Sequence, residues 1–378
     1  MSPGSERILT THTGSLPRPS ELTAMLKSRE SGELTDSDAF EDEVRQAVEE
    51  IVRKQAEAGI DIVNDGEQGR PGFATHTKYR LSGYGPKTTR FPGSYFADVE
   101  EFPEFAEQRG PAIERVQVPI CTGPIAYQAE GVHVDVENLT RAARGEKVAG
   151  TFLTSVAPGE LSVYFPNEFY ASQDEYLSVL ADRMREEYEA IYKGGHLLQL
   201  DAPDLTLGFH IYFRGSTVEE FRRKVEQHVE VLNAATANIP PESMRLHVCY
   251  GPTASPHHRD VELRDVLDII LKARPAGLNF EGANCRHEHD WRLFKDRFTL
   301  PEGKYLILGV IDVTTNRIEH PELVAERIVR LARAVGRENV VAGTDCGFGT
   351  AGRVVPSCVW AKLRSLAEGA RIASEELW

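Results

Sequence analysis

The sequence predicts a (β/α)8 barrel, an α/β fold with a parallel sheet closed on itself. From about residue 180 onward, amphipathic stretches alternate with short apolar runs, and each run ends in polar or reactive residues. The chain has 378 residues, and barrels commonly exceed about 250 residues as one unit. A doubly wound open sheet is the alternative architecture, but no glycine-rich GxGxxG loop follows an early strand. We therefore expect one barrel domain over residues 1–378.

The first half of the chain starts this pattern. Residues 7–19 are expected to form the first strand and its loop, and the helical segment 40–59 ends at Gly59 before a strand within 61–68. Residues 81–150 differ, because they are rich in aromatic residues, glycine and proline and show no clear helical period. We expect them to form an excursion, with a hairpin, over the mouth of the barrel; a small subdomain is the alternative.

Five further strands are predicted in the second half, within residues 196–204, 245–252, 276–284, 304–312 and 339–347. In a barrel, the carboxyl ends of all strands open on one face, where catalytic residues gather. The side chains expected to meet at that face are Asp201, His247, Cys249, Glu281, Asp312 and Cys346.

Composition excludes several classes of function. The formal net charge is −15 and the acidic residues are spread along the chain, which disfavours nucleic acid and anionic membranes as partners. The first residues lack the pattern of a signal peptide, and no apolar run reaches about 18 residues, so a cytoplasmic protein is expected. The five cysteines are sparse and odd in number, which disfavours a disulfide framework and favours metal binding or catalysis.

Four of the strand-end residues form a predicted metal site. His247 and Cys249 lie two residues apart on an extended segment, so both side chains point to the same side. Glu281 and Cys346 end other predicted strands. Two thiolates, an imidazole and a carboxylate suit zinc (Zn2+) better than magnesium or calcium. The alternative, in which each cysteine is a small buried apolar residue, is disfavoured by the polar surroundings of these strand ends.

These segments resemble the cobalamin-independent methionine synthase family, specifically its catalytic C-terminal barrel. HVCY (247–250), FEGANCR (280–286) and GTDCG (343–347) are similar to the segments that carry the family's zinc ligands. The resemblance covers essentially the whole chain. It implies that His247, Cys249, Glu281 and Cys346 hold zinc.

The resemblance extends to the substrate side. THTGSLPRP (11–19) is similar to the family's opening loop, which implies that Gly14 and Ser15 touch the polar tail of a thiol substrate. NDGEQGR (64–70) resembles the acidic loop, so Glu67 matches a residue that holds the amine of homocysteine, with Asp201 as its acidic partner.

Two departures weaken the case for a methyl-folate donor. Thr314 stands where the family carries a histidine acid, and residues 151–165 lack the tryptophan on which folate stacks. The closer likeness is to the short branch that includes epoxyalkane:coenzyme M transferases, which share THxGSLPRP, GVIDxTTN and GTDCGFGT. In that branch, zinc holds a thiolate that attacks an epoxide.

The expected function is zinc-dependent alkylation of a small-molecule thiol by an alkyl donor or an epoxide, in which a zinc-bound thiolate attacks an electrophilic carbon, most like the reaction of epoxyalkane:coenzyme M transferases. One alternative is methyl transfer to homocysteine or another thiol from a donor other than polyglutamyl folate; a second is a zinc-free barrel with a binding or decarboxylase-like role. The candidates for proton transfer are His12, His76, Tyr250 and His287, and Asp312 is a further catalytic candidate. Arg18 and Arg259 are candidates for an anionic tail, although a solvated loop is the simpler reading of residues 257–259. Homo-oligomerisation is left open.

Overall fold

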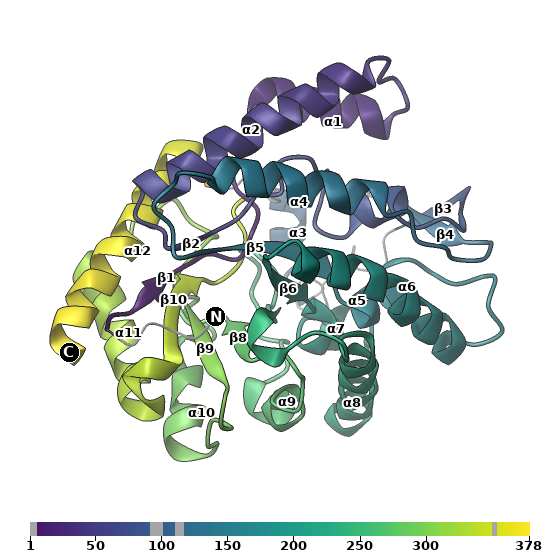
Figure 1. Cartoon of the computed structure of the whole chain (residues 1–378). Helices are drawn as coiled ribbons and strands as arrows, with labels where there is room; N and C mark the ends of the chain where they lie inside the picture. Colours follow the sequence, from purple (N-terminus) through teal and green to yellow (C-terminus); the bar gives the residue numbers. More distant parts are fainter. Residues whose placement is uncertain (1–5, 91–100, 110–116, 350–353) are drawn as a thin grey trace.

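The computed structural model describes residues 6–90, 101–109, 117–349 and 354–378. Its centre is an eight-stranded parallel sheet in the order β1-β10-β9-β8-β7-β6-β5-β2 (Figure 1). The strands are β1 Leu9–Thr10, β2 Ile62–Val63, β5 Gly150–Val156, β6 Leu197–Asp201, β7 Met244–His247, β8 Gly277–Phe280, β9 Tyr305–Ile311 and β10 Val340–Thr344. The two end strands approach each other, since Thr11 Oγ1 donates to the carbonyl of Ile62 at 3.0 Å. The predicted (β/α)8 barrel is confirmed as a sheet that is nearly closed.

Helices surround this sheet (Figure 1). They are α1 Ser20–Glu30, α2 Ser37–Glu57, α4 Glu130–Ala143, α5 Pro158–Tyr164, α6 Gln173–Lys193, α7 Gly208–Ile211, α8 Val218–Ala235, α9 Leu263–Ile270, α10 Trp291–Asp296, α11 Pro321–Val335 and α12 Pro356–Leu377. Their starts follow local capping chemistry: Asp36 caps α2 through the Ala39 N–H, and Thr217 and Glu220 form a capping box on α8. Among them α2, α4, α6, α11 and α12 pack directly on strands of the sheet, which helps to fix the strand ends that build the site.

The interior of the barrel contains a buried arginine. The side chain of Arg245 lies over the ring of Phe152, 3.4 Å from its centroid, and donates to Thr11 Oγ1 and to the carbonyl of His12, both at 2.9 Å. Burial lowers the pKa of Arg245 to about 9. These bonds anchor the loop that follows β1.

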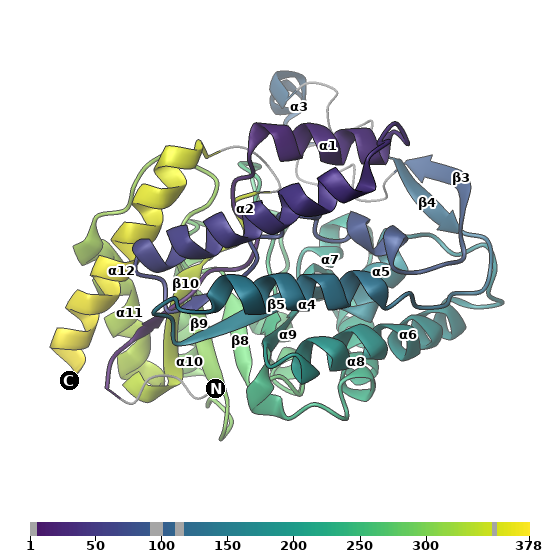
Figure 2. The ribbon, with the colours of Figure 1, turned by 45° about the horizontal axis from the view of Figure 1, so that its top comes forward.

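The segment 81–150 is only partly as expected. β3 Tyr84–Arg90 and β4 Gln117–Cys121 form an antiparallel pair that projects on the side of the molecule opposite α12 (Figure 2), and the short helix α3 Pro103–Arg109 lies between them in the chain. The segment, in which the sequence shows no clear helical period, also contains α4, which belongs to the outer layer of helices and contacts α2 and α6. Its glycine and three valines are poor helix formers, so tertiary packing of its buried face stabilises it. A lid function for the segment stays a prediction.

No helix within the described residues combines the length and the apolar character that a membrane crossing needs.

A buried ion pair joins α12 to the loop after β9. The Lys362 side chain is fully buried, and its Nζ donates to Glu319 Oε2 at 2.9 Å and to the carbonyl of Asp312 at 2.9 Å. We expect Lys362→Met to lower the free energy of unfolding by about 3–5 kcal/mol, because it leaves the Glu319 carboxylate buried without its cation. Urea denaturation measures this, with the exposed Lys224→Met as control. Equal stability of the two variants would contradict the expectation.

Candidate metal centre and substrate pocket

Three predicted ligands meet at the carboxyl ends of β7 and β10. His247 is the last residue of β7, and the Val248 N–H still bonds to the Asn279 carbonyl at 3.0 Å, so the extended backbone continues to Cys249. This keeps the imidazole and the thiol on one side. Cys346 follows the end of β10 by two residues. The ligand atoms of His247, Cys249 and Cys346 all lie within 4.8 Å of one another.

The environment of His247 suits a metal ligand. Its Nδ1 contacts Asp201 Oδ1 at 3.1 Å, while its Nε2 is buried and has no hydrogen-bond partner among the described residues. A carboxylate on one ring nitrogen leaves the other with a lone pair directed at a metal, an arrangement common in zinc sites. In the absence of a cation, the Cys346 thiol and burial raise the pKa of Cys249 well above its ordinary value. The donor set therefore fits a thiophilic cation, such as zinc, that allows two thiolates to lie together.

Glu281 stands apart from this group. Its Oε1 accepts from the Tyr250 N–H at 2.8 Å and its Oε2 accepts from Asn284 Nδ2 at 3.1 Å. Burial raises the pKa of Glu281. The three-residue group does not include its carboxylate, so its role as a fourth ligand stays a prediction.

A pocket of about 110 Å³ opens at the metal group. Its lining includes the acidic residues Glu67 and Asp201. It also includes the apolar residues Phe73, Pro203, Leu207 and Pro252. The pocket can therefore receive a molecule with a charged end and a second, apolar group beside the same metal position.

Glu67 is held in an unusual backbone conformation. Its φ is 54°, in the left-handed region that non-glycine residues rarely adopt. Arg18 Nη2 donates to its carbonyl at 2.8 Å and its own N–H donates to Asp65 Oδ1 at 3.0 Å, which stabilises this conformation. Gly14 allows the carboxylate to approach the opening loop, since a Cβ there would lie 2.8 Å from Glu67 Oε1.

Among the described residues, only one of the two oxygens of the Glu67 carboxylate has a hydrogen-bond partner. Its Oε1 accepts from Thr154 Oγ1 at 3.0 Å, whereas Oε2 is buried and has no partner within the part of the chain that the structure describes. Burial raises the pKa of Glu67 to about 7. A carboxylate of this kind, with Asp201 in the same pocket, is suited to receive a cationic group.

Comparison with known proteins shows the family of this chain. The model of the cobalamin-independent synthase catalytic domain matches residues 8–105 and 115–371. The chain belongs to this family. The resemblance predicted from the sequence is confirmed.

Relatives in the cobalamin-independent synthase family cover nearly the whole chain. The methionine synthase of Thermococcus kodakarensis is 27% identical over 97% of this chain and 94% of that protein, and that of Sulfolobus acidocaldarius is 25% identical over 97% and 93%. A solved B12-independent methionine synthase from Shewanella sp. W3-18-1, in complex with selenomethionine, is 20% identical, with a TM-score of 0.76 over 98% of this chain and 99% of that chain. That structure supports the barrel fold.

Some of the residues predicted to bind substrate line the pocket, and others do not. Ser15, Glu67 and Asp201 line the pocket. The two predicted arginines do not line it: Arg18 holds the Glu67 carbonyl, and Arg259 is half exposed and pairs with Glu101. Binding of an anionic tail by either arginine stays a prediction.

The predicted proton-transfer residues also lie outside the lining of the pocket. His12 is buried, with Nε2 2.7 Å from Gln55 Oε1 and Nδ1 accepting from the Gly14 N–H, and burial lowers its pKa to about 4. Asp312 accepts from the Thr314 N–H at 2.7 Å. Tyr250 stacks on His287. Their catalytic roles stay predictions.

Two aspartates at the site were not singled out from the sequence. Asp345, between the last strand and Cys346, accepts from the N–H groups of Gly282, Ala283 and Asn284 at 2.7–2.9 Å and so shapes the loop after Glu281. The sequence does place Asp345 inside the GTDCG motif. Asp260, by contrast, lies in none of the motifs that the sequence shows.

Asp260 contacts three histidines. They are His210, His257 and His287. The expectation of a solvated loop is wrong for His257, which is buried. Although burial opposes ionisation, the imidazole donors hold the pKa of Asp260 well below its usual range.

Proposed function

We propose that this protein is a zinc-dependent transferase that moves an alkyl group, in the simplest case methyl, to the sulfur of an amino thiol. The observation that carries the proposal is the shared pocket, in which the His247, Cys249 and Cys346 group lies beside the carboxylates of Glu67 and Asp201. The relatives named methionine synthase support thiol methylation as the type of reaction.

Each residue has a defined task in this reaction. His247, Cys249 and Cys346 would hold zinc, with Glu281 available as a fourth ligand after leaving Asn284. Zinc lowers the pKa of a thiol bound to it, which supplies a thiolate at neutral pH. The unpaired Oε2 of Glu67 accepts the substrate ammonium, and Asp201 adds a second negative charge while orienting the His247 ring. These contacts bind and orient the acceptor.

We assign the apolar residues of the pocket to binding of the alkyl donor. Phe73, Pro203, Leu207 and Pro252 exclude water from the side of the pocket where an electrophilic carbon would lie. In the transfer, the thiol releases its proton to the solvent, its sulfur forms a bond to the electrophilic carbon, and the leaving group departs with the electron pair of its bond to that carbon. A methyl donor other than polyglutamyl folate agrees with the missing tryptophan in residues 151–165.

Epoxide opening by coenzyme M is the second candidate. It is favoured by the motifs shared with the short branch and by Thr314 in place of a histidine acid. The amino-thiol assignment is preferred because a sulfonate would meet the negative charges of Glu67 and Asp201.

Isothermal titration of the zinc-loaded protein distinguishes the two acceptors. We expect homocysteine to bind with release of a proton from its thiol and coenzyme M to show no binding at the same concentration. Binding of coenzyme M without binding of homocysteine would overturn the amino-thiol assignment and support epoxide opening.

The affinity for the amino thiol should depend on pH through Glu67. Its pKa is raised to about 7 by burial, so the carboxyl is largely protonated below that pH and cannot pair with an ammonium. Affinity should therefore increase as pH rises through about 7 and then level off. Titrations across this range measure the effect, and a thiol of equal length without the amine corrects for ionisation of sulfur. The same pH profile for both thiols would contradict the assignment.

A further inference from the structure

A buried aspartate gathers three histidines beside the metal centre. Asp260 Oδ2 lies 2.9 Å from His257 Nδ1 and 2.7 Å from His287 Nε2, and its Oδ1 lies 3.0 Å from His210 Nε2. Asp260 is 5% exposed, and all three imidazoles are buried. None of these four residues lines the pocket at the metal group.

The cluster joins segments that follow three successive strands. His210 lies in α7 after β6, His257 lies in the loop after β7, and His287 lies in the loop after β8. His257 has a φ of 57°, in the left-handed region, and its Nε2 also lies 2.8 Å from the Thr253 carbonyl. Backbone strain at a non-glycine residue persists only where its surroundings fix the conformation. The contact with Asp260 is part of what fixes this loop.

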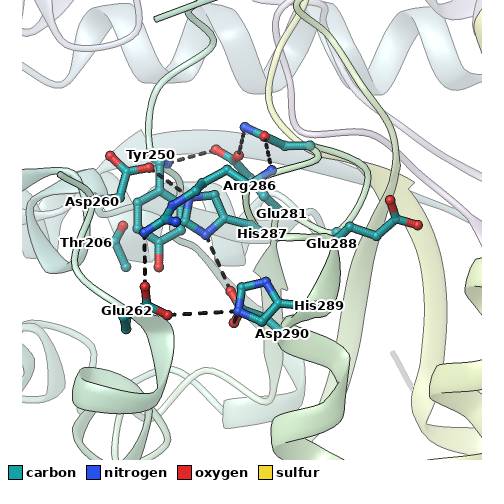
Figure 3. Close-up of polar contacts among 12 residues, drawn as sticks. Thr206, Tyr250, Asp260, Glu262, Glu281, Arg286, His287, Glu288, His289 and Asp290 are labelled. Atoms are coloured by element: carbon teal, nitrogen blue, oxygen red, sulfur yellow. Dashed lines mark hydrogen bonds and ion pairs between the residues drawn. The ribbon is translucent and has the colours of Figure 1, made fainter. Parts of the chain in front are cut away.

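One histidine of the cluster, His287, is connected to Glu281 through Tyr250. The ring of His287 lies flat against the ring of Tyr250, with centroids 3.6 Å apart and an angle of 4° between the planes (Figure 3). The backbone N–H of Tyr250 donates to Glu281 Oε1 at 2.8 Å (Figure 3). Tyr250 therefore connects the two groups: its ring contacts His287 and its backbone N–H binds Glu281.

The peptide that carries this N–H is held from a second side. Thr206 Oγ1 donates to the carbonyl of Cys249 at 2.6 Å, and Thr206 is fully buried. The Cys249–Tyr250 peptide thus bonds through its carbonyl to Thr206 and through its N–H to Glu281. The stacking of the Tyr250 ring on His287 adds a third contact that holds Tyr250 in place beside Glu281.

We propose that Asp260 is a positioning residue for the metal centre: through His287 and Tyr250 it directs the Tyr250 N–H and sets where the Glu281 carboxylate stands relative to the metal group. Asp260 does not touch substrate or metal in this role. The effect on metal binding rests on the proposed function, whereas the effect on the Tyr250 amide does not.

The first test is a double-mutant cycle on zinc affinity. Asp260→Asn keeps the side-chain volume but removes the charge and one acceptor oxygen. Competition with a chromogenic chelator should show zinc bound about 10- to 100-fold more weakly, as for other residues that orient a ligand. In a Glu281→Gln background, the same change should have an effect of less than about twofold, because the ligand it positions is absent. An equal loss in both backgrounds, or no loss in either, would overturn the proposal.

The second test needs no metal. Hydrogen exchange of the Tyr250 amide in the metal-free protein should be at least about tenfold faster in Asp260→Asn, because the bond to Glu281 opens more readily. His258→Gln is the matched control, since His258 is next to His257 but is partly exposed and pairs with Glu101. Thermal unfolding of both variants checks that the barrel is intact. Unchanged exchange at Tyr250 in Asp260→Asn would refute the positioning role even if wild-type protein binds no zinc, a result that by itself would count against the proposed function.

Discussion

Cys249→Ser is expected to remove bound zinc and turnover together. The substitution replaces a thiolate ligand by a hydroxyl that stays protonated at neutral pH, in a group that offers only two sulfur ligands. Changes to residues that merely orient a ligand cost about 10- to 100-fold in metal affinity or activity, so loss of a ligand should exceed about 100-fold. Elemental analysis and an alkyl-transfer assay on the same preparation measure both effects.

The control for this variant is Cys285→Ser. Cys285 is exposed and lies shortly after Glu281, outside the three-residue metal group. It should keep its zinc and its activity. Full activity of Cys249→Ser would contradict the proposed mechanism.

Glu67→Gln is expected to weaken binding of the amino thiol by about 10² to 10³-fold. The amide cannot neutralise the substrate ammonium, and loss of one partner of a buried charge pair costs about 2–5 kcal/mol. Zinc content should not change, because Glu67 is not in the metal group. Titration with homocysteine and with the matching thiol that lacks the amine separates the contribution of the ammonium contact from that of the thiol.

The thiol without the amine should bind Glu67→Gln as well as it binds wild type. Glu168→Gln, at an exposed carboxylate that pairs with Lys87, should bind both thiols normally. Equal weakening of both thiols by Glu67→Gln would show that the variant disturbs the pocket and not the ammonium contact.

The barrel and its strand-end chemistry were predictable because both depend on local sequence patterns. Apolar runs that alternate with amphipathic helices require a layered parallel sheet, and a parallel sheet places strand ends on one face. His247 and Cys249 point the same way because the backbone stays extended past β7. These inferences need only periodicity and topology.

The features that escaped prediction depend on contacts between distant segments. α4 contains a glycine and β-branched residues, and its packing against α2 and α6 stabilises it as a helix. Likewise, His257 is buried only because Asp260, His210 and His287 come together from separate loops. The direction of the Glu281 carboxylate depends on the Tyr250 N–H and Asn284, although its position at a strand end was predictable.

The most direct test of the central claim is the metal content of freshly purified wild type and of Cys346→Ala, measured by elemental analysis. We predict about one zinc per chain in wild type and loss of that zinc in the variant, because Cys346 supplies one of the sulfur ligands in the three-residue group. Absence of zinc from wild type, or equal zinc in both proteins, would contradict the proposed metal centre.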